Sequence, residues 1–552
     1  MLNPKVSQAV AAVLALGAVA SAHAVDITTV PSTNILYASG STAIDPALVA
    51  YMLDSADKIC DATQGAIDFY QGTSISGGKF VAVACNAGSN ISGVAAGTPI
   101  AMIKEDNAGS LNGINPINTP TSSVVSYPIV SQLTATVCPA GATTTPLGEQ
   151  QQTAHNCTGT YGTVSSTASS GPYANVGFAD VEAAIFGVNP TNTTAISTVD
   201  VPFGVAVSLG LYHALQGSQG LPEDDNVTHV PTLAQAQIAA IFNGTITSWS
   251  TVTGSGGTVG SQHVSFGNSH LVSGAPSCYD GTAFSTAADC TAPPAVAPAN
   301  TNVYFCERGQ SSGTQNTAQI FFGNIGCASN VVKFRTPSKP GTSCAASGCG
   351  WSTSTFGTAL TFAGNGTGDD LSCLEAHDGE GHFAMSFAGT DSAWGTDTTN
   401  TDRADWRFIK VNGAVPSIEN AASGRYDYWA QSAGYYPSST SAVNYPASGT
   451  VAAAMLQHFV GAGTQVGSAG SVVAIDDALE RVSPAFDGGI LSIPSNTPGG
   501  VPTPNASSVD QAGFRANPVN AYIKESPSNN CEKAYLAPSA PDASDFPTWA
   551  VP

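Results

Sequence analysis

Short apolar runs that end in small polar residues, and are followed by helix-like periodicity, recur along this chain of 552 residues. The apolar run 34–37 leads into a small-residue turn, 38–42, and then into a predicted helix over 46–58. Similar units start with the runs 100–103 and 303–306, and the second of these leads into a helix predicted near 315–322. Strands that alternate with helices predict an α/β fold with helix-covered sheets.

Long stretches rich in Gly, Ser, Thr and Pro separate these units, over residues 119–170, 254–300 and 336–368. They contain six of the twelve cysteines and show little apolar periodicity. We interpret them as surface insertions that disulfides hold together, because they have little core of their own.

The first 24 residues have the pattern of a secretory signal. Lys5 precedes an apolar run over 9–20, and Ala22-His23-Ala24 offers a cleavage site. The run is shorter than the roughly 18–20 residues of a spanning helix, and no later stretch is long enough. We therefore expect an exported protein, periplasmic or extracellular, that does not span the membrane.

Twelve cysteines follow the signal, an even number. An oxidising compartment favours disulfides, and paired spacings typical of zinc sites are absent from the sequence. Four local pairs are plausible, although spacing alone leaves the connectivity open. They are Cys60/Cys85, Cys138/Cys157, Cys278/Cys290 and Cys344/Cys349.

Charge is scarce and one-sided: 38 acidic residues face 16 basic ones, for a net charge of −22, yet only 10% of residues are charged. Globular proteins average roughly 25% charged residues, so neutral polar side chains must make up most of this surface. A net negative charge without a basic stripe opposes nucleic-acid binding. We exclude nucleic acid as a partner.

The third strand–turn–helix unit carries the clearest chemistry. Arg308 lies four residues before Ser312, where a predicted helix begins. The first turn of a helix presents backbone N–H groups to an anion, and a guanidinium adds a full positive charge with two-pronged geometry. A surface ion pair for Arg308 and a simple helix cap for Ser312 are the alternatives.

The motif Arg308-x-x-x-Ser312-Gly313-Thr314 resembles the signature of the phosphate-binding proteins of bacterial phosphate ABC transporters (PstS-like, type II periplasmic-binding-protein fold). Four other segments resemble that family in the same order, so the resemblance runs from about residue 34 to 429. These segments are 39–42, 176–180, 230–249 and 407–429.

The resemblance implies a two-lobed α/β fold with disulfide-stapled insertions, lobe 1 covering 25–201 plus 428–552 and lobe 2 covering 202–427. It implies inorganic phosphate held between the lobes, a phosphate ABC transporter permease as a further partner, and neither a cofactor nor catalytic residues. The phosphate-binding residues that it implies are Thr42, Ser110, Asp180, Arg308, Ser312, Gly313 and Thr314.

Two of these assignments have alternatives in the sequence. The family's second serine corresponds to Ser110 by its place after the strand 100–103, but the segment 70–78 looks locally similar and would offer Ser76. Asp180 by itself reads as a helix N-cap. In the family role its carboxylate accepts a hydrogen bond from the protonated ligand, which favours phosphate over sulfate.

A hydrolase is the enzymatic alternative. Gly309-Gln310-Ser311-Ser312-Gly313 fits G-x-S-x-G between a predicted strand and helix, with Ser311 as nucleophile and His458 as a late base. The pentapeptide comes late for that fold, and no oxyanion strand of the HGG type accompanies it. We favour a binding protein.

A second polar cluster comprises Asp369, Asp370, His377, Glu380 and His382. It could hold a divalent metal, but glycines interrupt it and helical spacing is missing. We favour a polar loop before a strand over 383–387, and we assign no metal ligands.

Aromatic residues gather late in the chain and allow a third class of function. A surface or adhesive scaffold that stacks on carbohydrate could use them. Core packing is the more common role for aromatics near a lobe crossover. They are Tyr426, Tyr428, Trp429, Tyr435 and Tyr436.

Overall fold

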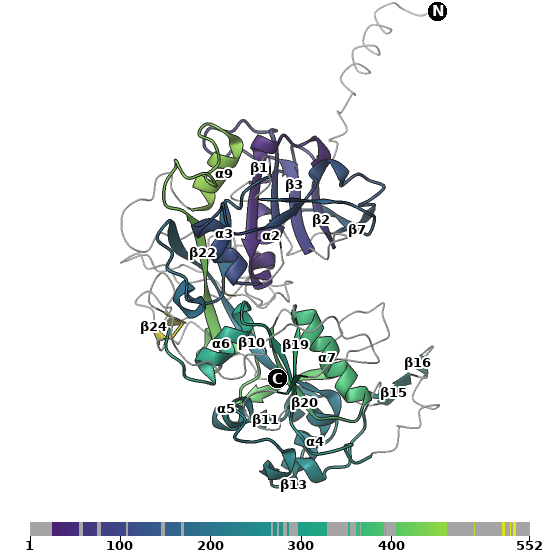
Figure 1. Ribbon diagram of the computed structural model, residues 1–552. Helices are drawn as coiled ribbons and strands as arrows, with labels where there is room; N and C mark the ends of the chain where they lie inside the picture. Colours follow the sequence, from purple (N-terminus) through teal and green to yellow (C-terminus); the bar gives the residue numbers. More distant parts are fainter. Residues whose placement is uncertain are drawn as a thin grey trace, which may run out of the picture.

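Two lobes make up this computed structural model, and two long strands run between them (Figure 1). The described residues are 25–53, 59–73, 79–105, 109–144, 150–166, 171–266, 269–272, 275–279, 284–285, 296–327, 352–353, 360–364, 366–390, 392, 405–460, 491, 522–524, 530–531 and 534–536.

Lobe 1 is built on a mixed sheet. Its centre is parallel, because β1 pairs with both β4 and β9 in that direction, and β3 joins antiparallel. Helices α2 (Asp45–Leu53), α3 (Leu111–Asn118) and α9 (Val451–Phe459) pack on it. The strand order is β9 (Val176–Ala179), β1 (Ile35–Gly40), β4 (Pro99–Glu105), β3 (Lys79–Asn86), β2 (Ile67–Thr73), β7 (Gln152–Cys157) and β6 (Ala140–Thr144).

Lobe 2 repeats this arrangement around β17, which is parallel to β19 and β20. Its strands are β18 (Ser352–Thr353), β19 (Leu360–Gly364), β17 (Tyr304–Arg308), β20 (Ala384–Gly389), β21 (Trp406–Val411) and β11 (Thr232–Leu233). Its helices include α4 (Leu209–Gln219), α5 (Gln235–Phe242), α6 (Gly313–Phe321), α7 (Thr367–Gly379) and α8 (Ile418–Ala422).

Smaller strands lie outside this framework, and β14 to β16 form a separate small sheet. They are β5 (Ser126–Pro128), β8 (Thr163–Ser165), β12 (Thr253–Gly254), β13 (Gly257–Thr258), β14 (Ser269–Val272), β15 (Ala275–Tyr279), β16 (Phe284–Ser285), β23 (Tyr522–Ile523) and β24 (Tyr535–Leu536).

The strands β10 (Thr193–Ser208) and β22 (Trp429–Pro437) connect the lobes. Along its first part β10 pairs with β22, up to Pro202 opposite Trp429. Beyond Phe203 it pairs with β20 and β21. This change of partners occurs at Pro202 and Phe203, and the lobe boundary between residues 201 and 202 stays a prediction. Because both strands stay paired across it, they are the natural place for a hinge.

The α/β class, the two lobes and the presence of disulfides are confirmed. Cys60–Cys85 and Cys138–Cys157 form as predicted. Cys290, Cys344 and Cys349, which the other two predicted pairs require, lie outside the described residues. Two further disulfides join elements far apart in sequence, Cys306–Cys373 and Cys327–Cys531, and spacing alone could not indicate them.

The prediction of surface insertions is wrong in part for two of the three segments, 119–170 and 336–368. In the first, β7 pairs with β2 and β6 with β7, so the segment extends the main sheet of lobe 1. In the third, β19 pairs with β17 at the centre of lobe 2. The strands of the first segment escaped detection because they are rich in Thr, Ala and Gln and lie at a sheet edge, where the apolar signal is weak.

The polar loop predicted before β20 is also wrong, because most of it forms α7. Asp369 accepts a hydrogen bond from the backbone N–H of Gly366 at 3.0 Å, and Asp370 follows in the same turn. Carboxylates stabilise the first turn of a helix by capping N–H groups and by opposing its dipole. The acidic run that looked like a loop is therefore a helix start.

The late aromatic residues belong to the core, as the more common role predicted. The side chains of Tyr426, Tyr428, Trp429 and Tyr435 are buried, and Tyr436 is partly exposed and packs against the core that contains Tyr426 and Tyr428. The four buried rings are not exposed for stacking on a sugar.

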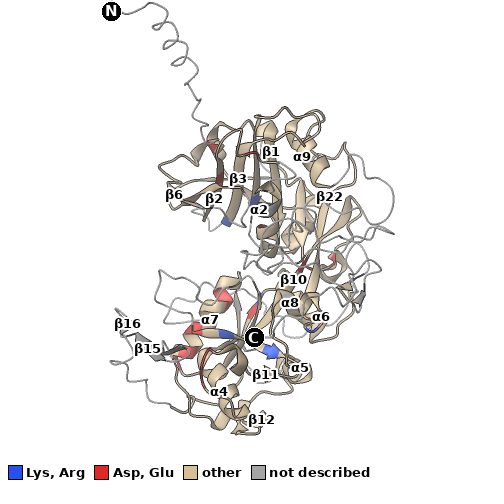
Figure 2. Ribbon diagram, turned by 180° about the vertical axis from the view of Figure 1, so that it is seen from behind, with Lys and Arg blue, Asp and Glu red and all other residues tan. Residues whose placement is uncertain are grey.

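Within the described segments, no helix is long and apolar enough to cross a membrane. Lys, Arg, Asp and Glu are sparse over both lobes (Figure 2). The predicted signal, residues 1–24, lies outside the described residues.

The Cys306–Cys373 bridge joins β17 to α7 and closes a loop of 67 residues, against 19 for Cys138–Cys157. We expect the double change Cys306→Ala/Cys373→Ala to lower the free energy of unfolding by about 2–5 kcal/mol. The same change at Cys138 and Cys157 should cost about 1 kcal/mol less, because the shorter loop restricts the unfolded chain less. Urea unfolding of the two variants measures the difference, and equal losses would contradict it.

Candidate functional site

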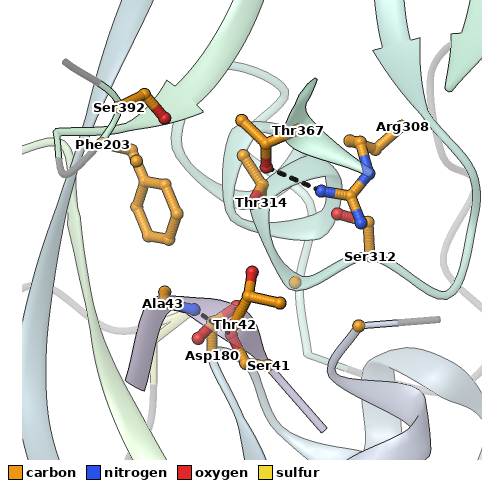
Figure 3. A pocket seen from close by; sticks show the side chains of 13 residues that line it. Ser41, Thr42, Ala43, Asp180, Phe203, Arg308, Ser312, Thr314, Thr367 and Ser392 are labelled. Atoms are coloured by element: carbon orange, nitrogen blue, oxygen red, sulfur yellow. Dashed lines mark hydrogen bonds between the residues drawn. The ribbon is translucent and has the colours of Figure 1, made fainter. Parts of the chain in front are cut away.

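The ends of several elements from both lobes surround one small cavity (Figure 3). Its volume is about 70 Å³. One water needs roughly 10–15 Å³ by this measure, so the cavity has room for about five water-sized groups. The lining residues are Ser41, Thr42, Ala43, Gly109, Asp180, Phe203, Arg308, Ser312, Gly313, Thr314, Thr367, Gly389 and Ser392.

Arg308 is the last residue of β17, and its side chain is only 7% exposed. Nη1 donates a hydrogen bond of 2.9 Å to Oγ1 of Thr367, the first residue of α7. Burial lowers the pKa of Arg308, while Asp370, Asp369 and Asp180 oppose that shift. A guanidinium remains charged under these conditions, so the cavity wall carries a fixed positive charge.

Asp370 lies behind this arginine. Its carboxyl is fully buried on α7 and packs so close to Gly364 that an added Cβ there would lie 2.2 Å from Oδ1. Burial raises the pKa of Asp370 well above its usual range, and Arg308 opposes the rise. The charge of Arg308 therefore interacts electrostatically with a carboxyl group that water does not reach.

Asp180 follows the last residue of β9 and forms the opposite wall. Its Oδ2 accepts hydrogen bonds from the hydroxyls of Ser41 at 2.7 Å and Ser110 at 3.0 Å. Its Oδ1 is buried and has no hydrogen-bond partner within the part of the chain that the structure describes. Burial raises its pKa, and the Ser41, Ser110, Arg308 and Lys104 side chains oppose that rise.

The beginning of α6 forms a third side of the cavity. Ser312 caps the helix, its hydroxyl accepting from the backbone N–H of Gln315 at 3.3 Å. Asn316 donates to the carbonyls of Gln310 and Ser312 and holds the preceding loop. The N–H groups of Gly313 and Thr314 belong to the first turn, which has no helical acceptors for them and carries positive dipole charge.

The two lobes touch at this point. An added Cβ on Gly313 would lie 2.1 Å from both Asp180 Oδ2 and Ser110 Oγ. The backbone N–H of Leu111 donates to the carbonyl of Ser311 at 3.2 Å. Lobe 2 thus approaches lobe 1 so closely that only a glycine fits at residue 313.

Six of the seven predicted site residues line the cavity: Thr42, Asp180, Arg308, Ser312, Gly313 and Thr314. Ser110 lies directly behind, bonded to the Asp180 carboxylate and accepting a 3.0 Å bond from the backbone N–H of Asp180. Its predicted role as a direct ligand thus becomes, in this geometry, one of holding Asp180. The alternative, Ser76, lies outside the described residues.

Sequence reasoning missed several residues at or around the cavity, among them Ser41, Thr367, Asp370 and Lys104. Ser41 sits beside the predicted Thr42 and is the N-cap of the short 3-10 helix Thr42–Ile44, a capping signal that could have found it. Thr367 and Asp370 were hidden because α7 was predicted as a loop. Lys104, buried and paired with Asp45 at 2.7 Å, sits in an apolar strand that gives no hint of a site.

The residues suggested for a hydrolase lie apart in the fold. Ser311 does not line the cavity, and the thirteen lining residues include no histidine. His458 is on α9, which packs on β1, and its Nδ1 shares a 3.0 Å hydrogen bond with the Tyr51 hydroxyl.

Among known proteins, no protein-family model and no curated protein matches this chain. Solved structures do match. An ABC-type phosphate transport receptor from Vibrio cholerae is 14% identical, with 49% of this chain and 69% of the other covered and a TM-score of 0.26. PstS from Borrelia burgdorferi is 10% identical, with 84% and 100% covered and a TM-score of 0.29. At these values the likeness carries no weight for function.

Replacing Gly313 by Ala tests the contact between the lobes. We expect a loss of about 1–3 kcal/mol in the free energy of unfolding, because the new methyl group must displace Asp180 or α6. Gly368→Ala is the matched control, since nothing lies within 4 Å of its added Cβ and alanine favours the helix. Thermal unfolding compares the two, and an unchanged Gly313→Ala protein would show that the lobes do not meet here.

Proposed function

We propose that this chain is a solute-binding protein, and that its ligand is a protonated inorganic oxyanion, phosphate, held in the cavity between the lobes. One observation carries the proposal: a buried arginine and a helix N-terminus face a buried aspartate across a space of a few atoms. Cation, N–H groups and acceptor are the three kinds of partner that a protonated anion requires.

The donors of the proposed site are mostly neutral. Arg308 would bind ligand oxygens through charge-assisted hydrogen bonds, and the N–H groups of Gly313 and Thr314 would add the helix dipole. The hydroxyls of Thr42, Ser312 and Thr314 would replace further water. The size of the cavity, about five water-sized groups, supports a tetrahedral oxyanion of five heavy atoms over a larger solute.

Asp180 supplies the selectivity in this proposal. A carboxylate only accepts hydrogen bonds, so it stabilises an anion that still carries a proton and repels one that has none. Its Oδ2 already accepts from Ser41 and Ser110, which leaves Oδ1 for the proton of the ligand. Phosphate at neutral pH carries such a proton, and sulfate does not.

The proposal also covers the kind of activity, the location of the protein and its partner. Binding rather than catalysis is favoured because Ser311 does not line the cavity, and His458, the base considered for it, shares a hydrogen bond with Tyr51 on α2. The predicted signal supports a periplasmic or extracellular location. The motif around Arg308 supports a phosphate ABC transporter permease as the partner that receives the ligand.

Arg308→Ala tests the site directly. We expect the affinity for phosphate to fall at least about 100-fold, because two charge-assisted hydrogen bonds would be lost. Calorimetric titration of the phosphate-stripped protein measures it. Arg425→Ala is the control, because Arg425 is exposed and is not among the residues that line the cavity. Thermal unfolding checks that both variants fold, and unchanged phosphate binding in folded Arg308→Ala would refute the assignment.

Asp180→Asn tests the selectivity. An amide can donate as well as accept, so we expect sulfate to bind this variant with an affinity within about tenfold of that for phosphate. Competition between the two anions in the wild-type protein and the variant measures the change. A variant that still rejects sulfate would show that Asp180 does not set the choice.

The pH dependence of sulfate binding follows from the same carboxyl group. Burial raises the pKa of Asp180, so on acidification it gains its proton earlier than an ordinary aspartate and becomes a donor. Sulfate affinity of the wild-type protein should therefore rise as the pH falls toward that pKa. The Asp180→Asn variant should bind sulfate without this trend, and a parallel trend in both proteins would contradict the role.

A further inference from the structure

The end of α7 far from Arg308 carries a second group of potential ligands. His377, Glu380 and His382 place one donor atom each within 4.8 Å of one another. Nδ1 of His377 lies 3.2 Å from Nδ1 of His382, and Oε2 of Glu380 lies 3.1 Å from the latter and 4.0 Å from the former. The proposed oxyanion site makes no use of these residues.

The helix ending itself creates this cluster. Gly381 has φ +72°. Its backbone N–H donates to the carbonyl of Asp378 at 2.9 Å, and the N–H of His382 donates to the carbonyl of His377 at 2.8 Å. This pair of bonds is the Schellman ending of a helix, in which the residues at 377 and 382 meet side by side. The side-chain contact across such an ending is usually apolar, but here both partners are histidines. Glu380 is the C-cap residue between α7 and Gly381, so its carboxylate lies next to the two rings.

The spacing of the three donors matches a tetrahedral metal. Ligand atoms about 2.0–2.2 Å from zinc lie about 3.3–3.5 Å from one another. The separations of 3.1 and 3.2 Å are close to this, and the 4.0 Å one closes by rotation of Glu380, which is half exposed. Two imidazoles and a carboxylate favour zinc over calcium or magnesium.

We propose that His377, Glu380 and His382 form a zinc site at the C-terminal end of α7, with the fourth position open to water. Nδ1 of each histidine and Oε2 of Glu380 would be the ligands. The nearby sulfurs of Cys306 and Cys373 form a disulfide and so supply no thiolate.

The surroundings fix the two rings. His377 is fully buried, and Tyr304 stacks on His382 at 4.2 Å with an interplanar angle of 14°. Asn300 donates to the Tyr304 hydroxyl at 2.8 Å. A metal here would fasten α7 at one end, as the Cys306–Cys373 bridge fastens it along its length.

The test is zinc binding by the metal-stripped full chain in phosphate-free buffer, with calorimetry and elemental analysis after dialysis. We expect one zinc per chain, and cobalt in its place should give the visible spectrum of a tetrahedral site. His382→Phe keeps an aromatic ring stacked on Tyr304 but removes one metal ligand. The affinity for zinc should therefore fall at least about 100-fold. Replacing a residue that only supports a ligand typically lowers metal affinity about 10–100-fold.

Two further variants keep the result decisive. Glu380→Gln changes a half-exposed side chain and should weaken zinc binding about tenfold even if His382→Phe fails to fold. His263→Gln, at an exposed histidine elsewhere in lobe 2, should change nothing. Less than one zinc per chain in the wild-type protein, or equal affinity in Glu380→Gln and wild type, would mean that the two rings share only a hydrogen bond.

Discussion

The burial of one guanidinium is the constraint on which the candidate site depends. Arg308 is 7% exposed in a chain with few charges of either sign, and a buried charge is costly unless partners surround it. Asp370 and Asp369 on α7 and Asp180 across the cavity provide that compensation electrostatically, and Thr367 provides a hydrogen bond. Each of these partners comes from an element that must hold its position.

That requirement explains features that are otherwise unrelated. The Cys306–Cys373 disulfide ties the strand that ends in Arg308 to the helix that carries Asp370. Gly313 lets α6 approach Asp180, so the aspartate of one lobe and the arginine of the other face the same space. A net charge of −22 cannot attract an anion through the overall field of the protein. In the proposed function, local dipoles and the buried charge of Arg308 would therefore have to supply the attraction.

Part of this could be predicted, because the strand–turn–helix unit around Arg308 is a local pattern of the chain. The segments with Thr42, Asp180 and Ser312 were indicated by their resemblance to a family's motifs, and together these signals pointed to six residues that line the cavity. Ser41 and Thr367 were missed for different reasons. Ser41 is the neighbour of Thr42, which was predicted and lines the cavity. Thr367 belongs to α7, whose acidic first turn was predicted as a loop. Lys104 gave no signal, because a lone lysine in an apolar strand acquires its role only from Asp45 and Asp180.

The sequence by itself determined the alternation of strands and helices and the neutral polar character of the chain, because these follow from periodicity and side-chain type. It indicated the residues of the candidate site through their resemblance to the motifs of a known family. Only the tertiary structure decided which residues meet. It set Ser110 behind Asp180, joined Cys306 to Cys373 across 67 residues, and turned His377 toward His382 at the end of a helix. Such contacts depend on distances between elements far apart in the chain, or on a backbone turn that a glycine permits, and no local pattern encodes them.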